Sequence, residues 1–246
     1  MESGENYSGL DELLSVETSL QNYNKDLVSK IRKGKKFVKS MEPVDSCLDF
    51  GAGIGTLAEI WRDEFNVQPI CVEIDDKCKS ILKSKGFQTF ATLDDIKDES
   101  QSHIYTSNVL EHIENDEVAL SQLYSKLQPG GILSIYVPAI PALFSELDRK
   151  VGHFRRYKKS ELMEKVERAG FSIELCEWND CLGIAGSLAM KILGYKSNGV
   201  VGGRESLVFY DRVIFPVSKI LDLVIFRKII GKNLLLHAVK KISEFS

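Results

Sequence analysis

The chain of 246 residues contains few cysteines, and none of them has the spacing of a metal or redox motif. Their number is odd, no CxxC pair occurs, and they fall mostly in apolar runs, as Cys47, Cys71, Cys78, Cys176 and Cys181. This pattern disfavours a disulfide framework and a zinc centre, and it predicts buried free thiols. Free thiols fit a reducing compartment, so we expect a cytoplasmic protein.

The sequence also lacks a surplus of positive charge and a long apolar run. Its net charge of −3 and pI near 5.9 argue against a protein whose main work is coating nucleic acid. No segment reaches the roughly 18 apolar residues of a spanning helix. The N-terminal residues MESGENYSGLDELL are polar and acidic, unlike a signal peptide, so we expect neither export nor a transmembrane segment.

What the sequence does contain is a regular alternation of strand and helix patterns. Apolar runs predict strands at 46–50, 69–74, 86–90, 103–106, 132–137, 171–178 and 233–239. Helical spacing predicts helices at 76–85, 109–127 and 159–169, and a helical arm or lid within residues 8–33. Such alternation predicts an α/β fold whose mainly parallel sheet carries helices on both faces and binds ligands at its carboxyl edge.

The stretch VDSCLDFGAGIGTLAEI, residues 44–60, predicts a buried strand, a glycine turn and a helix. Glycines at 51, 53 and 55 let the backbone approach a ligand more closely than a Cβ would permit. The third glycine follows the second by two residues instead of three, which favours S-adenosylmethionine over NAD, and no Gly-Lys-Ser/Thr follows as in a P-loop. A purely structural tight turn remains the alternative.

Acidic residues follow the next two predicted strands. Glu73 comes 22 residues after Gly51, at a strand end where a carboxylate can accept hydrogen bonds from ribose hydroxyls. Asp94 and Asp95 follow the third strand and could reach an adenine amino group. The alternative is that these carboxylates are simply exposed to solvent.

Four motifs together resemble class I S-adenosylmethionine-dependent methyltransferases: LDFGAGIG, CVEID, SNVLEHIENDEVAL and LQPGGILSIYVPA. The flanking segments YNKDLVSKI, LFSELDRKVGHFRRYKKSEL and FYDRVIFPVSKILD resemble a subgroup of small-molecule methyltransferases often found beside glycosyltransferases of cell-surface glycan assembly. The resemblance implies a Rossmann-like sheet of seven strands, the last of them inserted antiparallel between strands five and six. It also implies an N-terminal arm at 1–40 and a methyltransferase domain at 41–246, with a helical insertion at about 181–230.

The resemblance also implies roles for single residues toward the cofactor, S-adenosylmethionine. The methionine part would contact Asp49, Gly51, Ala52 and Gly53. The ribose would bind Glu73, and the adenine would lie between Ile74 and Leu93 with its amine near Asp94. Further contacts would come from Asn108 and Val109, and Tyr23 with Asn24 would close over the cofactor from the arm.

Transfer of a methyl group from a sulfonium needs an aligned nucleophile and a group that takes its proton. Of the four histidines we expect His112 and His153 to be catalytic, and we interpret His103 and His237 as structural. The alternative for His112 is a side chain that packs against the cofactor or caps a helix. Glu111-His112 resembles a metal-binding pattern of ubiquinone-pathway and small-RNA methyltransferases. Asn108 replaces the earlier glutamate of that pattern, so we predict no metal.

The segment from Asp148 to Tyr157 should lie over the substrate side, because it follows the fifth strand. His153 could act as a base there, and an acceptor phosphate or carboxylate would meet Arg149, Arg155, Arg156 and Tyr157. The alternative is a solvated basic turn.

Two apolar segments, 181–195 and 207–226, predict a helical cap or homodimer face, or a peripheral membrane contact. We expect an enzyme that methylates a small polar acceptor, with O-methylation of a sugar or lipid-linked glycan intermediate as the specific hypothesis, and no nucleic-acid partner. An RNA or protein methyltransferase, a Rossmann-type dehydrogenase and a non-catalytic cofactor-binding module are the alternatives.

Overall fold

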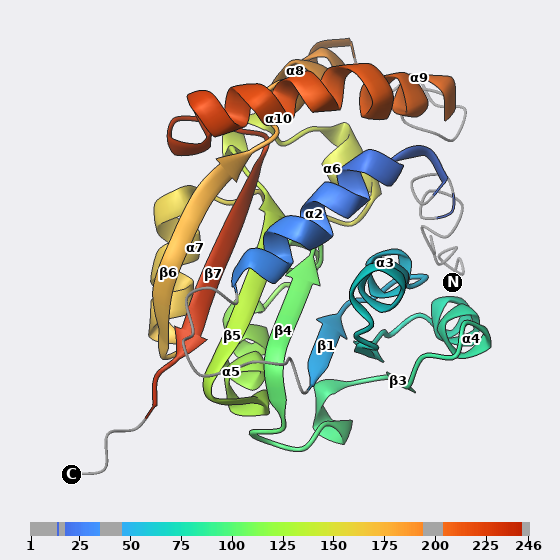
Figure 1. Ribbon diagram of the computed structural model, residues 1–246. Helices are drawn as coiled ribbons and strands as arrows, with labels where there is room; N and C mark the ends of the chain where they lie inside the picture. Colours follow the sequence, from blue (N-terminus) through green and yellow to red (C-terminus); the bar gives the residue numbers. More distant parts are fainter. Residues whose placement is uncertain (1–13, 15–17, 35–45, 194–203, 243–246) are drawn as a thin grey trace, which may run out of the picture.

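The computed structural model describes residues 14, 18–34, 46–193 and 204–242, and Figure 1 shows their arrangement. Seven strands form one sheet in the order β3-β2-β1-β4-β5-β7-β6. They are β1 (Cys47–Phe50), β2 (Ile70–Val72), β3 (Thr89–Phe90), β4 (Gln101–Ser107), β5 (Leu127–Pro138), β6 (Phe171–Asn179) and β7 (Asn233–Lys240). The four strand pairs from β3 to β5 are parallel, whereas β7 runs antiparallel to both β5 and β6. The predicted placement of the last strand is confirmed.

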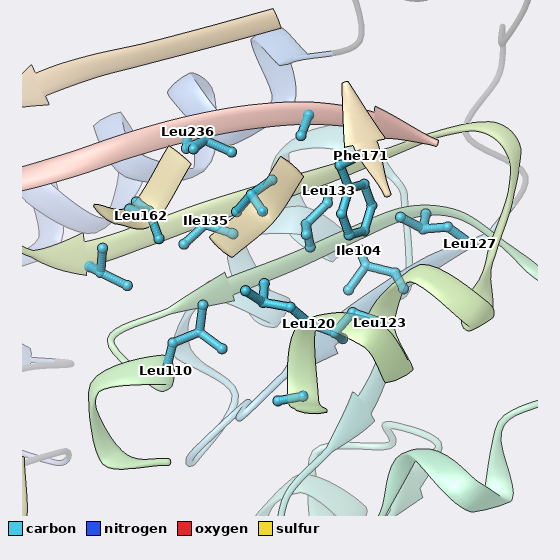
Figure 2. Close-up of a cluster of buried hydrophobic side chains, with 14 of the residues drawn as sticks. Ile104, Leu110, Leu120, Leu123, Leu127, Leu133, Ile135, Leu162, Phe171 and Leu236 are labelled. Atoms are coloured by element: carbon cyan, nitrogen blue, oxygen red, sulfur yellow. The ribbon is translucent and has the colours of Figure 1, made fainter. Parts of the chain in front are cut away.

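Helices cover both faces of the sheet because its strands have apolar side chains on both sides. One face packs against α5 (Asp116–Lys126) and α7 (Lys159–Arg168), and Figure 2 shows that core around Ile135. The next residue, Tyr136, belongs to the opposite cluster, beneath α2 (Gln21–Lys33) and α3 (Thr56–Phe65). Neighbouring residues of one strand thus anchor different helix layers, as the pleat requires. A smaller cluster joins α3 to α4 (Asp76–Ser84).

Two predicted boundaries were wrong. The helix expected at 109–127 begins only at Asp116, and a separate 3-10 turn, Leu110–His112, precedes it. This break brings the backbone of Glu111 to the later loop, where its carbonyl accepts a hydrogen bond from the Phe154 N–H at 2.8 Å. The fifth strand begins at Leu127, five residues before the predicted start, because it pairs with Gln101 of β4 before a register shift.

The predicted insertion lies between β6 and β7. It contains α8 (Gly183–Leu193), α9 (Arg204–Phe209), a π-helical turn at Tyr210–Ile214, α10 (Phe215–Val224) and a 3-10 turn at Phe226–Lys228. Figure 1 places α8, α9 and α10 beyond the carboxyl ends of β4 and β5. None of the helices in the described part of the chain is long and apolar enough to cross a membrane.

Of the predicted N-terminal arm only residue 14 and residues 18–34 are described, since residues 1–13, 15–17 and 35–45 lie outside the described ranges. Its helix α2 packs Leu27, Val28 and Ile31 against the sheet. Two short helical elements follow β5, a 3-10 turn at Pro141–Leu143 and α6 (Glu146–Lys150).

The structure confirms two expectations about buried side chains. All five cysteines are free thiols, and only Cys176 is partly exposed. His103 on β4 and His237 on β7 are buried on either side of β5, whose Ser134 Oγ lies 2.9 Å from His103 Nε2 and 2.9 Å from His237 Nδ1. Both imidazoles therefore contact the same hydroxyl group inside the sheet. This contact gives the two histidines a structural role.

Candidate active site

The glycine turn after β1 is packed closely against the segment that follows β4. Gly51 has a φ of +80°, and a Cβ at this position would come within 2.2 Å of Val109 Cγ2. The N–H groups of Gly51 and Ala52 both donate to the carbonyl oxygen of Val72, at 2.8 and 3.2 Å. The turn therefore needs glycine for conformation and for space, and it brings β1, β2 and the segment after β4 to one point.

Glu73 holds the turn from the end of β2. Its Oε2 accepts a hydrogen bond from the Gly53 N–H at 2.7 Å, and its Oε1 accepts one from the Asp75 N–H at 2.9 Å. Each carboxylate oxygen has a second lone pair, so ribose hydroxyls can still be bound. Ile74, beside it, is 82% exposed, which is unusual for an isoleucine and leaves its side chain available to an adenine face.

Asp49 at the end of β1 is almost fully buried beneath the turn. Burial and the nearby carboxylate of Glu73 raise the pKa of Asp49 to about 7, although contact with the Tyr105 hydroxyl acts in the opposite direction. A cationic group placed here would favour the ionised carboxylate. This matches the predicted contact with the methionine part of the cofactor, and that contact stays a prediction.

The remaining predicted cofactor contacts lie in different environments. Asn108 is exposed with a φ of +53°, and its N–H donates to the Tyr136 carbonyl at 2.8 Å. Asp94 is exposed after β3, whereas the Leu93 side chain is only 3% exposed and packs in the core. Leu93 therefore offers little side-chain surface to an adenine ring.

Tyr23 and Asn24 from the arm are more enclosed than expected. The Tyr23 hydroxyl lies 2.7 Å from the hydroxyl of Tyr136, and its ring packs against Phe215 of the insertion at a centroid distance of 5.0 Å. Asn24 is buried. The arm is thus fixed to the sheet and to the insertion at this point.

The structure brings both predicted catalytic histidines together. The rings of His112 and His153 are perpendicular with centroids 4.5 Å apart, and His153 Nδ1 lies 2.9 Å from Asp148 Oδ1. His153 Nε2 faces Glu111 Oε1 at 4.0 Å. Since Asp148 accepts from Nδ1, the basic nitrogen of a neutral His153 is Nε2.

Glu111 is the least expected member of this cluster. It is fully buried, and neither carboxylate oxygen has a hydrogen-bond partner among the described residues. Burial raises the pKa of Glu111 to about 8, so the side chain is a neutral acid near pH 7. Loss of hydration, with His153 beside it, lowers the pKa of His112 to about 4, so this imidazole is neutral as well.

One ligand atom from each of Glu111, His112 and His153 lies within 4.8 Å of the others, which is a spacing that a metal ion could bridge. Sequence reasoning could not place His153 next to the Glu-His pair. The donor types suit a divalent ion. Burial raises the pKa of Glu111, so a cation bound there would have to displace the proton of that carboxyl group. The catalytic roles of His112 and His153 and the absence of a metal stay predictions.

Asp148 is the charged centre of the loop after β5. Burial alone would raise its pKa, yet hydrogen bonds from His153 and Arg156 hold the pKa of Asp148 well below its usual range. Arg156 Nε donates to Asp148 Oδ1 at 2.8 Å and its NH2 donates to Oδ2 at 3.1 Å. Ser145 adds its N–H and hydroxyl to Oδ2, both at 2.8 Å. The carboxylate is therefore ionised and fixed, and it orients His153.

The predicted substrate contacts at Arg156 and Tyr157 are not supported. Arg156 is 9% exposed and committed to Asp148, and Tyr157 is fully buried with its hydroxyl donating to Asp116 Oδ2 at 2.7 Å. Arg155 is only partly exposed, and it bonds Asp116 at 2.9 Å and the Glu114 carbonyl at 2.7 Å. Arg149 remains exposed above the Phe144 ring. The sequence shows that this segment has many charged residues, but it does not show that most of them form ion pairs within the fold.

The parallel sheet, the glycine turn at its carboxyl edge and the antiparallel last strand define the class I methyltransferase fold. A family model described as a methyltransferase domain matches residues 20–175, and the chain belongs to this family. It is an enzyme of the S-adenosylmethionine-dependent class. No curated protein sequence matches the chain at a significant level.

Solved structures share the fold at low sequence identity. A methyltransferase in complex with the Trm112 activator of Haloferax volcanii has a TM-score of 0.63 and 13% identity, covering 98% of this chain and 100% of that one. A SAM-dependent methyltransferase from Archaeoglobus fulgidus has a TM-score of 0.57 and 20% identity, covering 88% and 94%. A Haemonchus contortus phosphoethanolamine N-methyltransferase, solved with S-adenosylhomocysteine, has a TM-score of 0.56 and 18% identity, covering 89% and 53%.

Proposed function

We propose that this enzyme methylates a hydroxyl group of a small polar acceptor, a sugar or a lipid-linked glycan intermediate. The observation that carries the proposal is the Asp148–His153 pair, whose hydrogen bond is 2.9 Å long, beside the segment that contacts the glycine turn. A hydroxyl oxygen needs a base when it takes a methyl group, because the product oxygen cannot keep its proton. Amine or thiolate acceptors would depend less on such a pair.

S-adenosylmethionine, when bound, supplies a methyl group that is already activated on its sulfonium. The residues of this chain then have two tasks. Gly51, Gly53 and Glu73 would hold the cofactor at the carboxyl edge of the sheet, with its methionine part toward Asp49. His153 would accept the acceptor's proton at Nε2, and Asp148 would stabilise the imidazolium that forms.

Arg149 and Arg155 are the remaining candidates for binding an acceptor phosphate or carboxylate, since each keeps some exposed surface. A phosphate-bearing acceptor is consistent with the hypothesis of a glycan intermediate. We also propose that the enzyme belongs to the subgroup found beside cell-surface glycosyltransferases. Its proposed location is the cytoplasm. The five free thiols support that location.

The test combines cofactor binding with methyl transfer from radiolabelled S-adenosylmethionine to sugars, sugar phosphates and lipid-linked saccharides. His153→Ala should leave the dissociation constant for S-adenosylmethionine nearly unchanged and reduce turnover by about 10²–10⁴-fold, the range of a general base. Asp148→Asn should lower kcat with a smaller change in KM. Equal loss of cofactor binding in His153→Ala would contradict the assignment.

Two outcomes would favour other functions. Cofactor binding without methyl transfer to any acceptor would support a non-catalytic module, and transfer to RNA or protein substrates alone would overturn the small-molecule acceptor. Binding of NADH in place of S-adenosylmethionine would contradict the proposal altogether. Calorimetry with both cofactors separates the last case from the others before any acceptor is known.

A further inference from the structure

The helical segment from α9 to α10 has its polar side inward and its apolar side outward. Its buried residues recur every three or four positions, and three of the four are polar: Asp211, Ser218 and Asp222, with Phe215 between them. Large apolar side chains recur with the same spacing on the outer side, and they are between 50% and 73% exposed: Phe209, Val213, Val217, Ile220 and Val224. A helix at the surface of a soluble protein normally has the reverse arrangement.

The inward polar residues hold the segment in this orientation. The Asp211 carboxylate accepts hydrogen bonds from the Asn22 and Tyr23 N–H groups at 3.0 and 2.8 Å. Asp222 accepts from the Asp180 and Cys181 N–H groups at 2.6 and 3.1 Å. Rotation of the helix to bury its apolar side would leave these backbone donors without partners, which is costly. The outward apolar side is therefore a fixed feature of the fold.

Exposed apolar side chains are more frequent in this segment than in the rest of the described chain. Eleven of its sixteen exposed large hydrophobic residues lie between Leu188 and Ile230. Besides the outer side of α9 to α10, they include Leu188 and Ile192 of α8 and Ile229 and Ile230 after α10. We call this set the apolar face. Monomeric soluble proteins rarely expose so many clustered apolar side chains without a partner.

The charged residues around the apolar face indicate what kind of partner it binds. Residues 183–193 and 204–232 carry three acids, of which Asp211 and Asp222 are buried and only Glu205 is exposed. The same ranges carry seven bases, all at least partly exposed: Lys191, Arg204, Arg212, Lys219, Arg227, Lys228 and Lys232. Two of these bases pair with acids outside the ranges, Lys219 with Asp26 and Arg227 with Glu177. The other bases leave a local positive charge on a chain whose net charge is −3. Apolar side chains flanked by basic ones are complementary to an anionic lipid surface.

A second copy of the chain fits this face less well. A two-fold contact would place the basic surface of one copy against the same basic surface of the other. The electrostatic cost would be highest in the apolar contact, where water is excluded. A bilayer with anionic headgroups satisfies both the apolar and the basic components.

We propose that the apolar face docks the enzyme onto the surface of an anionic lipid bilayer without spanning it. The face is connected to the candidate active site, because α8 packs against the segment 141–150 that leads to His153. Lys191 Nζ also donates to the Ala142 carbonyl within that segment. Docking would therefore bring the substrate side of the site near the membrane surface. The proposal does not depend on the identity of the acceptor or on catalysis.

The test is flotation of the full-length protein with vesicles. We expect it to rise with vesicles of phosphatidylglycerol and phosphatidylcholine in equal parts, and to remain at the bottom with phosphatidylcholine alone. The double variant Ile220→Asp, Val224→Asp should reduce the bound fraction at least about tenfold, because it places two charges in the apolar contact. Arg212→Gln and Lys228→Gln should each weaken binding by about fivefold at low salt.

Matched controls separate docking from general effects of charge. Val118→Asp changes a valine on α5 that is 52% exposed, and Lys97→Gln removes an exposed lysine outside the insertion. Neither should change flotation, and circular dichroism should show all variants folded. Absence of flotation at low salt, or equal loss in Val118→Asp, would overturn the proposal. So would a stable dimer in dilute solution that Ile220→Asp converts to monomer.

Discussion

Replacement of Glu111 by glutamine tests the protonation state of the candidate site. The buried carboxyl group has its pKa raised from 4.5 to about 8, so the folded protein keeps a proton that the unfolded chain releases above pH 4.5. The contribution of this group to the free energy of unfolding should therefore fall as pH rises from about 4.5 to about 8, and it should be constant above that. At 1.36 kcal/mol per pH unit, this group alone removes about 3 kcal/mol between pH 5 and pH 7.

Glu111→Gln should not show that loss, because glutamine does not ionise. Urea unfolding followed by circular dichroism at several pH values gives the free energy of unfolding for both proteins. The free energy of unfolding of the variant minus that of the unmodified protein should increase by about 3 kcal/mol between pH 5 and pH 7. Glu146→Gln, which changes an exposed glutamate of α6, is the control and should give a constant difference. A constant difference for Glu111→Gln would mean that Glu111 is ionised in the fold, as a bound cation would require, and would refute the reading of an acid and base site.

Three further predictions concern the turn and its surroundings. Gly51→Ala should destabilise the protein by several kcal/mol more than Gly86→Ala, because both have positive φ but only Gly51 meets Val109, within 2.2 Å; thermal unfolding measures both. Affinity for S-adenosylmethionine should fall in calorimetry as pH drops below about 7, where Asp49 becomes protonated. Asp116→Asn should cost about 3 kcal/mol in urea unfolding, because it removes the buried carboxylate that the partly buried Arg155 and Lys165 share.

The order of strands and helices could be read from the sequence because each element carries a local signal. The parallel strands are short apolar runs, and the turn after β1 is marked by glycines that its positive φ values require. The predicted boundary at 109 failed for a tertiary reason. A 3-10 turn at Leu110–His112 is favoured by the contact between Glu111 and Phe154, which is distant in sequence.

The candidate site was predictable to different degrees on its two sides. On the cofactor side, the spacing from Gly51 to Glu73 follows from one βαβ unit, so sequence distance and spatial contact agree. On the acceptor side, the sequence indicates that His153, Arg156 and Tyr157 are close along the chain but not which of them remain available. Burial and internal pairing with Asp148 and Asp116 commit Arg156 and Tyr157 to the structure.

The sequence by itself determined the class of fold, the cofactor turn and the apolar character of the insertion, because these depend on local spacing and composition. Only the tertiary structure decided three other features. It joined His153 to His112 and Glu111 across two loops, it buried the Glu111 carboxyl group where no described residue hydrogen-bonds it, and it turned the apolar side of α10 outward. Each of these depends on which distant groups satisfy the polar atoms, and periodicity along one chain segment does not contain that information.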